Sequence, residues 1–389
     1  MAFTNHCLRI RKPLKINIIL LTLLILCSCS HSYERRHKIR KVNFIRSNFS
    51  DIYGWHYDNH LASLKALSRS CEKIKTLNSS KPISNSSAVG GKAKQWQTVC
   101  KNLDIKKIKD DLCAKRFYEK WFTPYLILDD KGSASGKVTG YYEISINGSL
   151  TKTNRYRYPV YRSPSNLAHV KRSVWLSHAA INRGSLRGKG LEIVWVDNLA
   201  RLHWMQIQGS GLINIGKSQK LRLGYDGQNG FDYTSVGPFF KKYGATNIKS
   251  GLDMIEWVHD NPNAGRKIIE HNKSYVFFKE AADHGPVGGQ GVTLIPERSV
   301  AIDNGLYPFG MPIWVETTLP HSRNYANRKY RRLLISQDKG GAIKGALRID
   351  IFFGSGQRAE ELACYMNNSA KLFAMFPKSV SVQRHYRSK

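Results

Sequence analysis

The chain has 389 residues and carries 61 Lys and Arg against 28 Asp and Glu, a formal net charge of +33. A mature chain of about 360 residues exceeds what one hydrophobic core usually serves, so we expect two domains. The charge fits nucleic acid, anionic lipid or an acidic polymer, and the export signal described next argues against nucleic acid; a lysine-rich proteome is the alternative explanation.

The N-terminus has the pattern of a lipoprotein export signal. Four basic residues precede an apolar run at 16–26, which is shorter than the roughly 20 residues needed to span a bilayer. The small Ser28 comes directly before Cys29, so we expect residues 1–28 to be removed, Cys29 to be lipidated and the net charge to fall to +29. Because Ser30 is not the aspartate associated with inner-membrane retention, we expect a lipid anchor at the periplasmic face of the outer membrane. An uncleaved anchor, or a plain signal with a chance cysteine, is the alternative.

Residues 29–52 are basic and polar, and we expect a flexible tether there. Residues 53–93 predict a helix with a leucine stripe at helical spacing, followed by a Ser/Gly linker at 77–92. A second helical stretch is expected from Ile105 to Phe122. Cys71 and Cys100 are our preferred disulfide, because the bond would tie the first helix to the segment beyond the linker; the sequence leaves the connectivity open.

Beyond residue 122, short runs rich in Val, Ile, Tyr and Trp are broken by glycine, which indicates β-structure. One helix interrupts this region, because Ser250 and Asp253 resemble a capping box and Asn261-Pro262 ends the pattern. A last amphipathic helix is expected from Ala359 to Met366. The predicted fold is therefore mainly β, with a few flanking helices.

The segment at 333–356 is the most informative of the chain. Strict alternation from Leu347 onward predicts a strand with apolar residues on one face and Arg348, Asp350 and Phe352 on the other. Aspartate is depleted in strands, so a carboxylate on the non-core face indicates a functional residue. An ordinary surface pair with Arg348 is the alternative.

Two further aspartates stand at expected strand ends. Asp338 precedes Gly340-Gly341, and Asp303 ends the run SVAID. Such carboxylates either close loops by accepting backbone amides or join Asp350 in an acidic cluster that raises one pKa. Both interpretations stay open.

A saccharide-binding face is the second hypothesis. The alternation at 195–211 predicts a strand that presents Trp204, Gln206 and Gln208 together, since aromatic faces stack on sugar rings and amides bridge hydroxyl pairs. Tyr142 and Asn229, from the segments GYY and GYDGQNG, add similar groups. The alternative is that these aromatic residues fill a β core.

Several familiar catalytic signatures are missing. The sequence has no phosphate loop, no HExxH zinc helix, no Gly-x-Ser-x-Gly elbow and no dinucleotide fingerprint. The histidines and cysteines show no metal-ligand spacing. We therefore expect neither a cofactor nor a metal.

Eight segments stand out along the chain. They are VTGYYEI (138–144), GKGLEIVWVDN (188–198), HWMQIQGSG (203–211), RLGYDGQNG (222–230), NKSYVFF (272–278), PERSVAID (296–303), YPFGMPIWVE (307–316) and SQDKGGAIKGALRIDIFFGSG (336–356). Each motif is modest alone, but together and in this order they resemble the MltA family of membrane-bound lytic murein transglycosylases, and the shared order makes coincidence improbable.

The resemblance implies a double-psi β-barrel catalytic domain from 94–143 and 291–389. A second, inserted β-barrel domain that binds substrate, at 144–290, is implied between these two parts. It also implies that Asp350 is the catalytic acid, with Asp338 and Asp303 as a supporting acidic cluster. The Asp350 assignment agrees with the strand-face argument, which uses the residues alone.

The implied activity is cleavage of the MurNAc-GlcNAc β-1,4 bond of peptidoglycan glycan strands with formation of 1,6-anhydromuramyl ends. The C6 hydroxyl attacks its own anomeric carbon, so one residue can serve as acid and then as base. Lys344 and Arg348 are candidates for contacting the carboxylates of the substrate. Two alternatives remain: a two-carboxylate muramidase using Asp350 with Asp303 or Glu143, and a non-catalytic glycan-binding lipoprotein.

Overall fold

The computed structural model describes residues 41–84, 89–167, 175–281, 284–321, 325, 328–383 and 385–387. The expected signal peptide, the lipidated Cys29 and the first part of the tether lie outside these described residues. Within the described part, no helix combines the length and the apolar character that crossing a bilayer requires.

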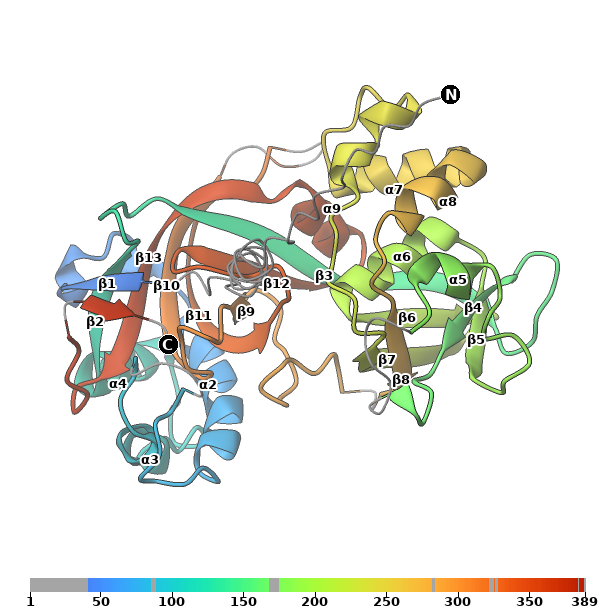
Figure 1. The fold of residues 1–389 in the computed structure, drawn as a ribbon. Helices are drawn as coiled ribbons and strands as arrows, with labels where there is room; N and C mark the ends of the chain where they lie inside the picture. The colour runs from blue at the N-terminus through green and yellow to red at the C-terminus, as the bar shows by residue number, and fades with distance from the viewer. Residues whose placement is uncertain are drawn as a thin grey trace, which may run out of the picture. The chain divides into compact units, whose positions relative to one another are not determined.

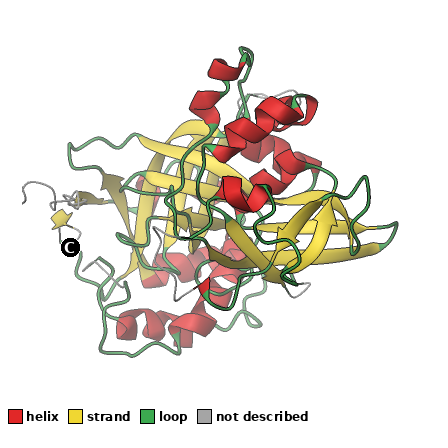
Figure 2. Cartoon of the chain, turned by 45° about the vertical axis from the view of Figure 1, so that its right-hand side comes forward, coloured by secondary structure: helices red, strands yellow, loops and turns green. Residues whose placement is uncertain are grey.

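Strands dominate the fold, and helices lie against them (Figure 2). The strands are β1 (Lys41–Arg46), β2 (Phe122–Leu128), β3 (Gly136–Ser149), β4 (Tyr158–Tyr161), β5 (Glu192–Val196), β6 (Ser210–Ile215), β7 (Gln219–Gln228), β8 (Val276–Glu280), β9 (Ser299–Ile302), β10 (Pro312–Thr318), β11 (Lys329–Lys339), β12 (Arg348–Ser355), β13 (Asn367–Pro377) and β14 (His385–Arg387).

Helices occur in two groups along the chain, before β2 and between β4 and β8, with one more before β13. They are α2 (His60–Ile74), α3 (Ala93–Lys101), α4 (Asp111–Trp121), α5 (His178–Asn182), α6 (Leu199–Gln208), α7 (Gly251–Asp260), α8 (Pro262–Glu270) and α9 (Gln357–Tyr365), with short 3-10 turns η1 (Phe49–Asp51), η2 (Trp55–Tyr57), η5 (Gly237–Phe239) and η6 (Lys241–Tyr243).

The strand pairings in the larger part of the sheet return to their starting point. The order β10, β11, β9, β12 and β3 is continued by β13, which pairs with both β3 and β10. The pairs β9–β11 and β12–β3 are parallel, whereas β9–β12 is antiparallel. The neighbours β9, β11 and β12 can be followed in Figure 1. The fold is thus a mixed, sheet-dominated one.

One long strand connects this part of the sheet to the rest. β3 has 14 residues, and its partners change along its length. Up to Glu143 it pairs with β12 and β13, and from Ile144 it pairs with β6 and, at its end, with β5. The following stretch to residue 281 holds β4 to β8 together with α5 to α8, so its described residues are less purely β than the sequence indicates.

The expected tether at 29–52 is wrong for its described part. β1 pairs with β2 and with β14, and it buries Val42 and Phe44 completely or nearly so, at 0% and 3% exposure. These two side chains lie on one face of the strand because they are two residues apart. The apolar alternation is too short to stand out from the basic sequence around it.

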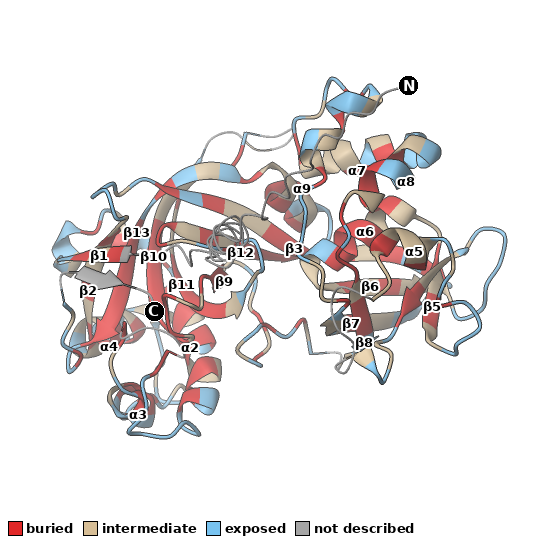
Figure 3. Cartoon of the chain, in the orientation of Figure 1, coloured by how far each residue is buried: buried red, intermediate tan, exposed pale blue. Residues whose placement is uncertain are grey.

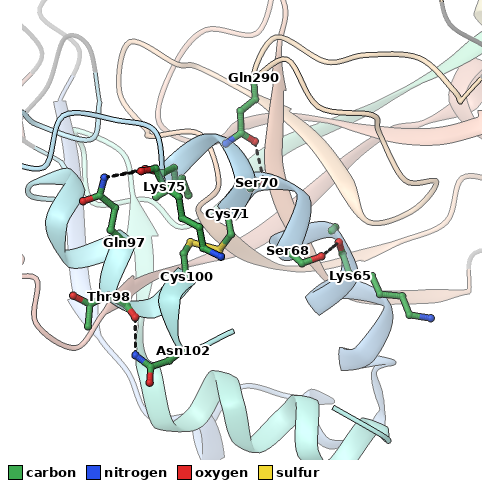
Figure 4. The surroundings of a disulfide bond; sticks show 12 residues. Lys65, Ser68, Ser70, Cys71, Lys75, Gln97, Thr98, Cys100, Asn102 and Gln290 are labelled. Carbon is green, nitrogen blue, oxygen red and sulfur yellow. Dashed lines mark hydrogen bonds between the residues drawn. A yellow bond between two sulfur atoms is a disulfide. The ribbon is translucent and has the colours of Figure 1, made fainter. Parts of the chain in front are cut away.

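The helix expected within 53–93 is α2, and it packs on β11 and on α4. Its Cys71 forms a disulfide with Cys100 of α3, which is the pairing we prefer from the sequence (Figure 4). Ser70 Oγ donates to Gln290 Oε1 at 2.8 Å, as the same figure shows. The N-terminal helices are therefore fastened to the sheet and to the loop that leads into β9.

Caps set the remaining helix ends. α4 starts at Asp111, later than the expected Ile105, because the carboxylate of Asp110 accepts the amide of Cys113 at 2.7 Å. α7 has the capping box predicted from Ser250 and Asp253, which is confirmed. Figure 3 shows that buried residues are concentrated on the central strands, and β9 is buried throughout.

Candidate active site

Four neighbouring strands place Asp338, Ala301, Asp350 and Thr139 in one row across the sheet. Asp338 lies opposite Ala301, and Ala301 lies opposite Asp350 on its other side. Asp350 in turn lies opposite Thr139 on β3. Neighbouring strands are about 4.8 Å apart and directly opposite residues share a face, so the Cα atoms of the two aspartates are about 10 Å apart on one face. The residue between them is the small Ala301, which is only 4% exposed.

A β-bulge decides which residue of β11 joins the row. The register against β9 shifts between Ser336 and Asp338, so that Gln337 is the extra residue. The Gln337 side chain is fully buried; its Oε1 accepts from Ser299 Oγ at 2.6 Å, and its Nε2 donates to the backbone of α2. The bulge therefore takes Gln337 into the interior and brings Asp338 onto the face of Asp350.

Asp350 is held by a short hydrogen-bonded chain. The hydroxyl of Thr139 donates to Asp350 Oδ1 at 2.6 Å, and the same hydroxyl oxygen accepts from Arg348 Nη2 at 2.8 Å. Arg348 and Asp350 thus meet through Thr139, and no direct ion pair joins them among the described residues. The simple surface-pair alternative for Asp350 does not describe this geometry.

The surroundings of Asp350 are apolar. A small buried cluster lies apart from the main core and consists of Tyr141, Leu294, Ala301, Ile343 and Phe352. Tyr141 follows Thr139 by two residues and Phe352 follows Asp350 by two, so each shares a strand face with its partner. Asp350 keeps some contact with solvent, but protein crowds its carboxyl. Desolvation therefore raises its pKa from 3.8 to about 6, against the opposing effects of Thr139 and Arg348.

Asp338 is engaged on both carboxylate oxygens. Tyr141 donates its hydroxyl to Oδ2 at 2.8 Å, while the backbone amides of Gly289 and Lys339 donate to Oδ1 at 2.7 and 2.8 Å. Desolvation nevertheless raises the pKa of Asp338, and its negative charge contributes to raising that of Asp350. The row therefore contains one positioned carboxylate and one carboxyl whose proton is available near neutral pH.

This arrangement can perform general acid–base chemistry. A catalytic group works best when its pKa lies near the working pH, because it must both hold and release a proton. Asp350 meets this condition, whereas both oxygens of Asp338 are already occupied by donors. One carboxyl group on a partly exposed sheet face can give a proton to a leaving oxygen and later take one back.

Asp303 is not part of this row. It follows β9 directly and is fully buried, and its carboxylate accepts the amides of Gly305 and Gly345 at 3.1 and 2.8 Å. Lys344 Nζ lies 4.0 Å from Oδ1. Of the two interpretations left open by the sequence, the loop-closing one describes its contacts.

Glu143, the other carboxylate considered for a two-carboxylate reaction, is also engaged. It is 2% exposed and forms a paired contact with Arg222, with Nε to Oε1 at 2.8 Å and Nη2 to Oε2 at 3.2 Å. A buried carboxylate held by a guanidinium fork has no free oxygen directed at a water or a substrate. Its place in the fold is that of a structural ion pair.

The predicted strand at 195–211 is wrong over most of its length, since Leu199–Gln208 form helix α6. Asn198 caps it through the amide of Arg201 at 3.0 Å, and Gly209 ends it in the left-handed conformation. Trp204 and Gln206 are 6% and 7% exposed and belong to the interior, and Gln208 Oε1 accepts the amide of Tyr142. The expected saccharide face of these three residues is therefore not formed.

Two more predicted contact residues have structural partners. The hydroxyl of Tyr142 donates to Glu360 Oε1 at 2.8 Å, and Glu360 in turn pairs with Arg201. Asn229 is 2% exposed and bridges the backbone of Leu176, Lys273 and Tyr275. Both side chains are engaged in hydrogen bonds within the protein, so neither is available as the predicted saccharide contact.

Sequence reasoning missed the two β3 residues that contact the aspartates. The motif VTGYYEI holds Thr139 and Tyr141 on one strand face and Tyr142 on the other. Applying the alternation already used for β12 to this strand indicates Tyr141 rather than Tyr142. Gly289, the loop residue that donates to Asp338, carries no signal in the sequence.

Of the two cationic candidates, Arg348 reaches the row through Thr139, whereas Lys344 lies beside Asp303. Arg348 contacts Thr139, and burial lowers its pKa although Asp350 opposes the shift. Lys344 is largely exposed. In the part of the chain that the structure covers, no group of three or more His, Cys, Asp or Glu side chains is arranged to hold a metal ion.

Comparison with known proteins covers both parts of the sheet. A family model described as the MltA specific insert domain matches residues 137–279, and one described as the 3D domain matches residues 298–375. The second match contains Asp338 and Asp350.

Relatives and solved structures agree with these matches. A membrane-bound lytic murein transglycosylase A homolog of Buchnera aphidicola is 28% identical over 371 residues, which are 94% of this chain and 97% of the relative. The membrane-bound lytic murein transglycosylase A of Vibrio cholerae is 34% identical over 235 residues, 59% of this chain and 62% of the relative. The crystal structure of a membrane-bound lytic murein transglycosylase from Agrobacterium tumefaciens is similar with a TM-score of 0.76 and 26% identity, covering 86% of this chain and 98% of that one.

Proposed function

The chain belongs to the MltA family, and from this we propose that it is a lytic transglycosylase acting on peptidoglycan. It cleaves the MurNAc-GlcNAc β-1,4 bond and leaves 1,6-anhydromuramyl ends, in cell-wall remodelling and turnover. The observation that carries the proposal is the row of strands in which Asp350, with its pKa raised to about 6, lies against the hydroxyl of Thr139.

The reaction follows from the protonation of one carboxyl group. Asp350 begins protonated and donates to the glycosidic oxygen towards N-acetylglucosamine as the bond to the anomeric carbon breaks. The resulting carboxylate then accepts the proton of the C6 hydroxyl of N-acetylmuramic acid as that oxygen bonds to the anomeric carbon. The proton given in the first step is recovered in the second, so the enzyme is regenerated without water.

The neighbours of Asp350 have distinct tasks in this proposal. Thr139 donates to Asp350 Oδ1, which leaves Oδ2 for the substrate and stabilises the carboxylate formed midway. Asp338 positions Tyr141 and the Gly289 backbone, and its charge adds to the desolvation that raises the pKa of Asp350. Asp303 positions the loop at Gly345 that leads into β12. Arg348 is a candidate contact for substrate carboxylates.

The other carboxylates already accept hydrogen bonds from protein donors, which favours this reaction over hydrolysis by a muramidase. A hydrolase needs a second carboxylate as nucleophile or to activate water. Glu143 is paired with Arg222, Asp303 accepts two amides, and Asp338 accepts from three donors. Asp350 is thus the carboxyl of this set best suited to exchange a proton.

We also propose the finer fold and location expected from the resemblance. The closed pairing of β10, β11, β9, β12, β3 and β13 supports a double-psi β-barrel, with the substrate-binding insert starting after Glu143, where the partners of β3 change. A lipid on Cys29 and a place at the periplasmic face of the outer membrane fit the export signal and the membrane-bound relatives. The basic mature chain suits a polymer that carries carboxylates.

Digestion of purified sacculi, with mass spectrometry of the products, tests the proposal. Wild-type protein is expected to release anhydromuropeptides, and Asp350→Ala with an unchanged circular dichroism spectrum is expected to release none. Products with reducing muramic acid ends would show a muramidase instead. Binding to sacculi without any release would show a glycan-binding lipoprotein.

A further inference from the structure

A cavity of about 610 Å³ is lined entirely by residues of the segment that the insert-domain model matches. Its walls come from β4, β5, the end of α5 with the turn that follows, and α8. None of Asp350, Asp338, Thr139 and Tyr141 lines it. The volume is in the range of pockets that hold small ligands, roughly 300–1,000 Å³.

Aromatic side chains form part of the cavity wall. Trp195 lies opposite Pro159, and Glu192 lies opposite Tyr161, across the antiparallel pair β4–β5. Residues directly opposite each other share a face, so each pair presents its side chains together. Tyr158 lines the cavity as well. Flat aromatic faces beside polar groups suit sugar rings, which have apolar faces and hydroxyl edges.

Two polar groups in this wall are buried without a partner among the described residues. The Tyr161 side chain is 1% exposed, yet its hydroxyl has no hydrogen-bond partner, and the same holds for Asn182 Nδ2. Burial, with Glu192 nearby, raises the pKa of Tyr161 to about 12, so the hydroxyl stays neutral and can both donate and accept. Buried polar groups are normally hydrogen-bonded, so these two are suited to a ligand that supplies hydroxyl or carbonyl oxygens.

The charges around the cavity are mainly positive. Lys152, Arg157, Arg187 and Arg266 are among its lining residues, against the single acid Glu192. The guanidinium of Arg157 lies 5.2 Å from the ring centre of the neighbouring Tyr158. Arginine forks bind carboxylates with two parallel hydrogen bonds, so this rim favours an anionic ligand.

From the aromatic wall, the unpartnered polar groups and the basic rim, we propose that this cavity is a second binding site for an acidic saccharide of the muramyl class, distinct from the aspartate row. The identification of the ligand's acidic group as a muramyl lactyl or peptide carboxylate rests on the proposed function. Tyr161 and Asn182 would bind ring substituents, while Arg187 and Arg266 would bind the carboxylate. Binding a polymer at two places raises its effective concentration at the reacting site.

Calorimetric titration with a matched pair of ligands tests the proposal. GlcNAc-MurNAc and chitobiose differ by the lactyl carboxylate, and the full-length Asp350→Asn protein removes turnover. We expect the muramyl disaccharide to bind at least tenfold more tightly than chitobiose, with an affinity that weakens in salt. Tyr161→Phe and Arg266→Ala are each expected to weaken its binding at least tenfold. Arg183→Ala is the matched control, because Arg183 is exposed, follows Asn182 directly and does not line the cavity.

Each outcome decides a different question. Undetectable binding, equal affinity for chitobiose, or binding unchanged by both cavity variants overturns the second site. Tyr161→Phe removes only an unpartnered hydroxyl, so it is expected to fold even where Arg266→Ala does not. Wild-type release of anhydromuropeptides together with a cavity that binds nothing leaves the proposed function standing. Cavity binding without that release overturns the proposed function and leaves a muramyl-binding site.

Discussion

Replacing Asp350 by asparagine separates a catalytic acid from a structural carboxylate, because it removes the charge and keeps the shape. Asparagine still offers an oxygen to the Thr139 hydroxyl, which is 2.6 Å from Oδ1 in the wild type. It has no proton to give to a glycosidic oxygen. Loss of a positioned general acid is expected to lower the rate at least about 100-fold.

The same substitution is expected to stabilise the fold at neutral pH. The pKa of Asp350 is about 6 in the folded protein, against an ordinary value of 3.8. Between these values the native state keeps a proton that the unfolded chain releases, so wild-type stability falls as the pH rises through this window. At 1.36 kcal/mol for each pKa unit, the loss is about 3 kcal/mol at most, and we expect Asp350→Asn to be about 1–3 kcal/mol more stable at pH 7.

Urea denaturation below pH 3.8 and at pH 7, combined with sacculus digestion, measures both effects. The stability advantage of Asp350→Asn is expected to vanish in acid and to be present at pH 7, where the variant is inactive. Asp303→Asn is a matched control, since Asp303 is buried but accepts two backbone amides and is expected to lose stability on substitution. A less stable Asp350→Asn at pH 7, or an advantage independent of pH, would refute the proposed environment of this carboxyl.

Four further substitutions test two groups beside Asp350 and two contacts that hold the fold. Thr139→Val removes a donor that lowers the pKa of Asp350, so the alkaline limb of the pH–rate profile should move to higher pH; Asp338→Asn removes a charge that raises it and should move the limb to lower pH. Glu143→Gln breaks a buried ion pair and should lower the free energy of unfolding measured in urea by about 3 kcal/mol. Because Glu143 has a structural role, the folded fraction of this variant should still release anhydromuropeptides. Cys100→Ser should lower stability by about 3–4 kcal/mol through loss of loop closure, with wild type under reducing conditions as its comparison.

Local patterns in the sequence were sufficient for some elements of this protein. The alternation in β12 places Ile349 and Ile351 in the main core and Phe352 on the opposite face, as predicted from period two alone; that Phe352 is buried there in a separate cluster was not predicted. The capping box at Ser250 and Asp253 could be predicted because its hydrogen bonds join residues three apart in the chain.

The same kind of pattern failed at α6. Trp204, Gln206 and Gln208 alternate in polarity like a strand, but the cap at Asn198 and the left-handed Gly209 define a helix that buries the first two. Short segments fit both periods, and packing against the sheet decides between them.

The local alternation of polar and apolar residues is enough to place Asp350 on the non-core face of a strand, because this property depends only on neighbouring residues. The groups that surround its carboxyl come from distant segments and follow from the packing of the whole chain. Thr139 and Tyr141 reach the aspartates across more than 190 residues of chain, and the bulge at Gln337 selects Asp338 for the row. Strand register and desolvation arise only when distant segments pack together, and they set the pKa that makes Asp350 a candidate acid.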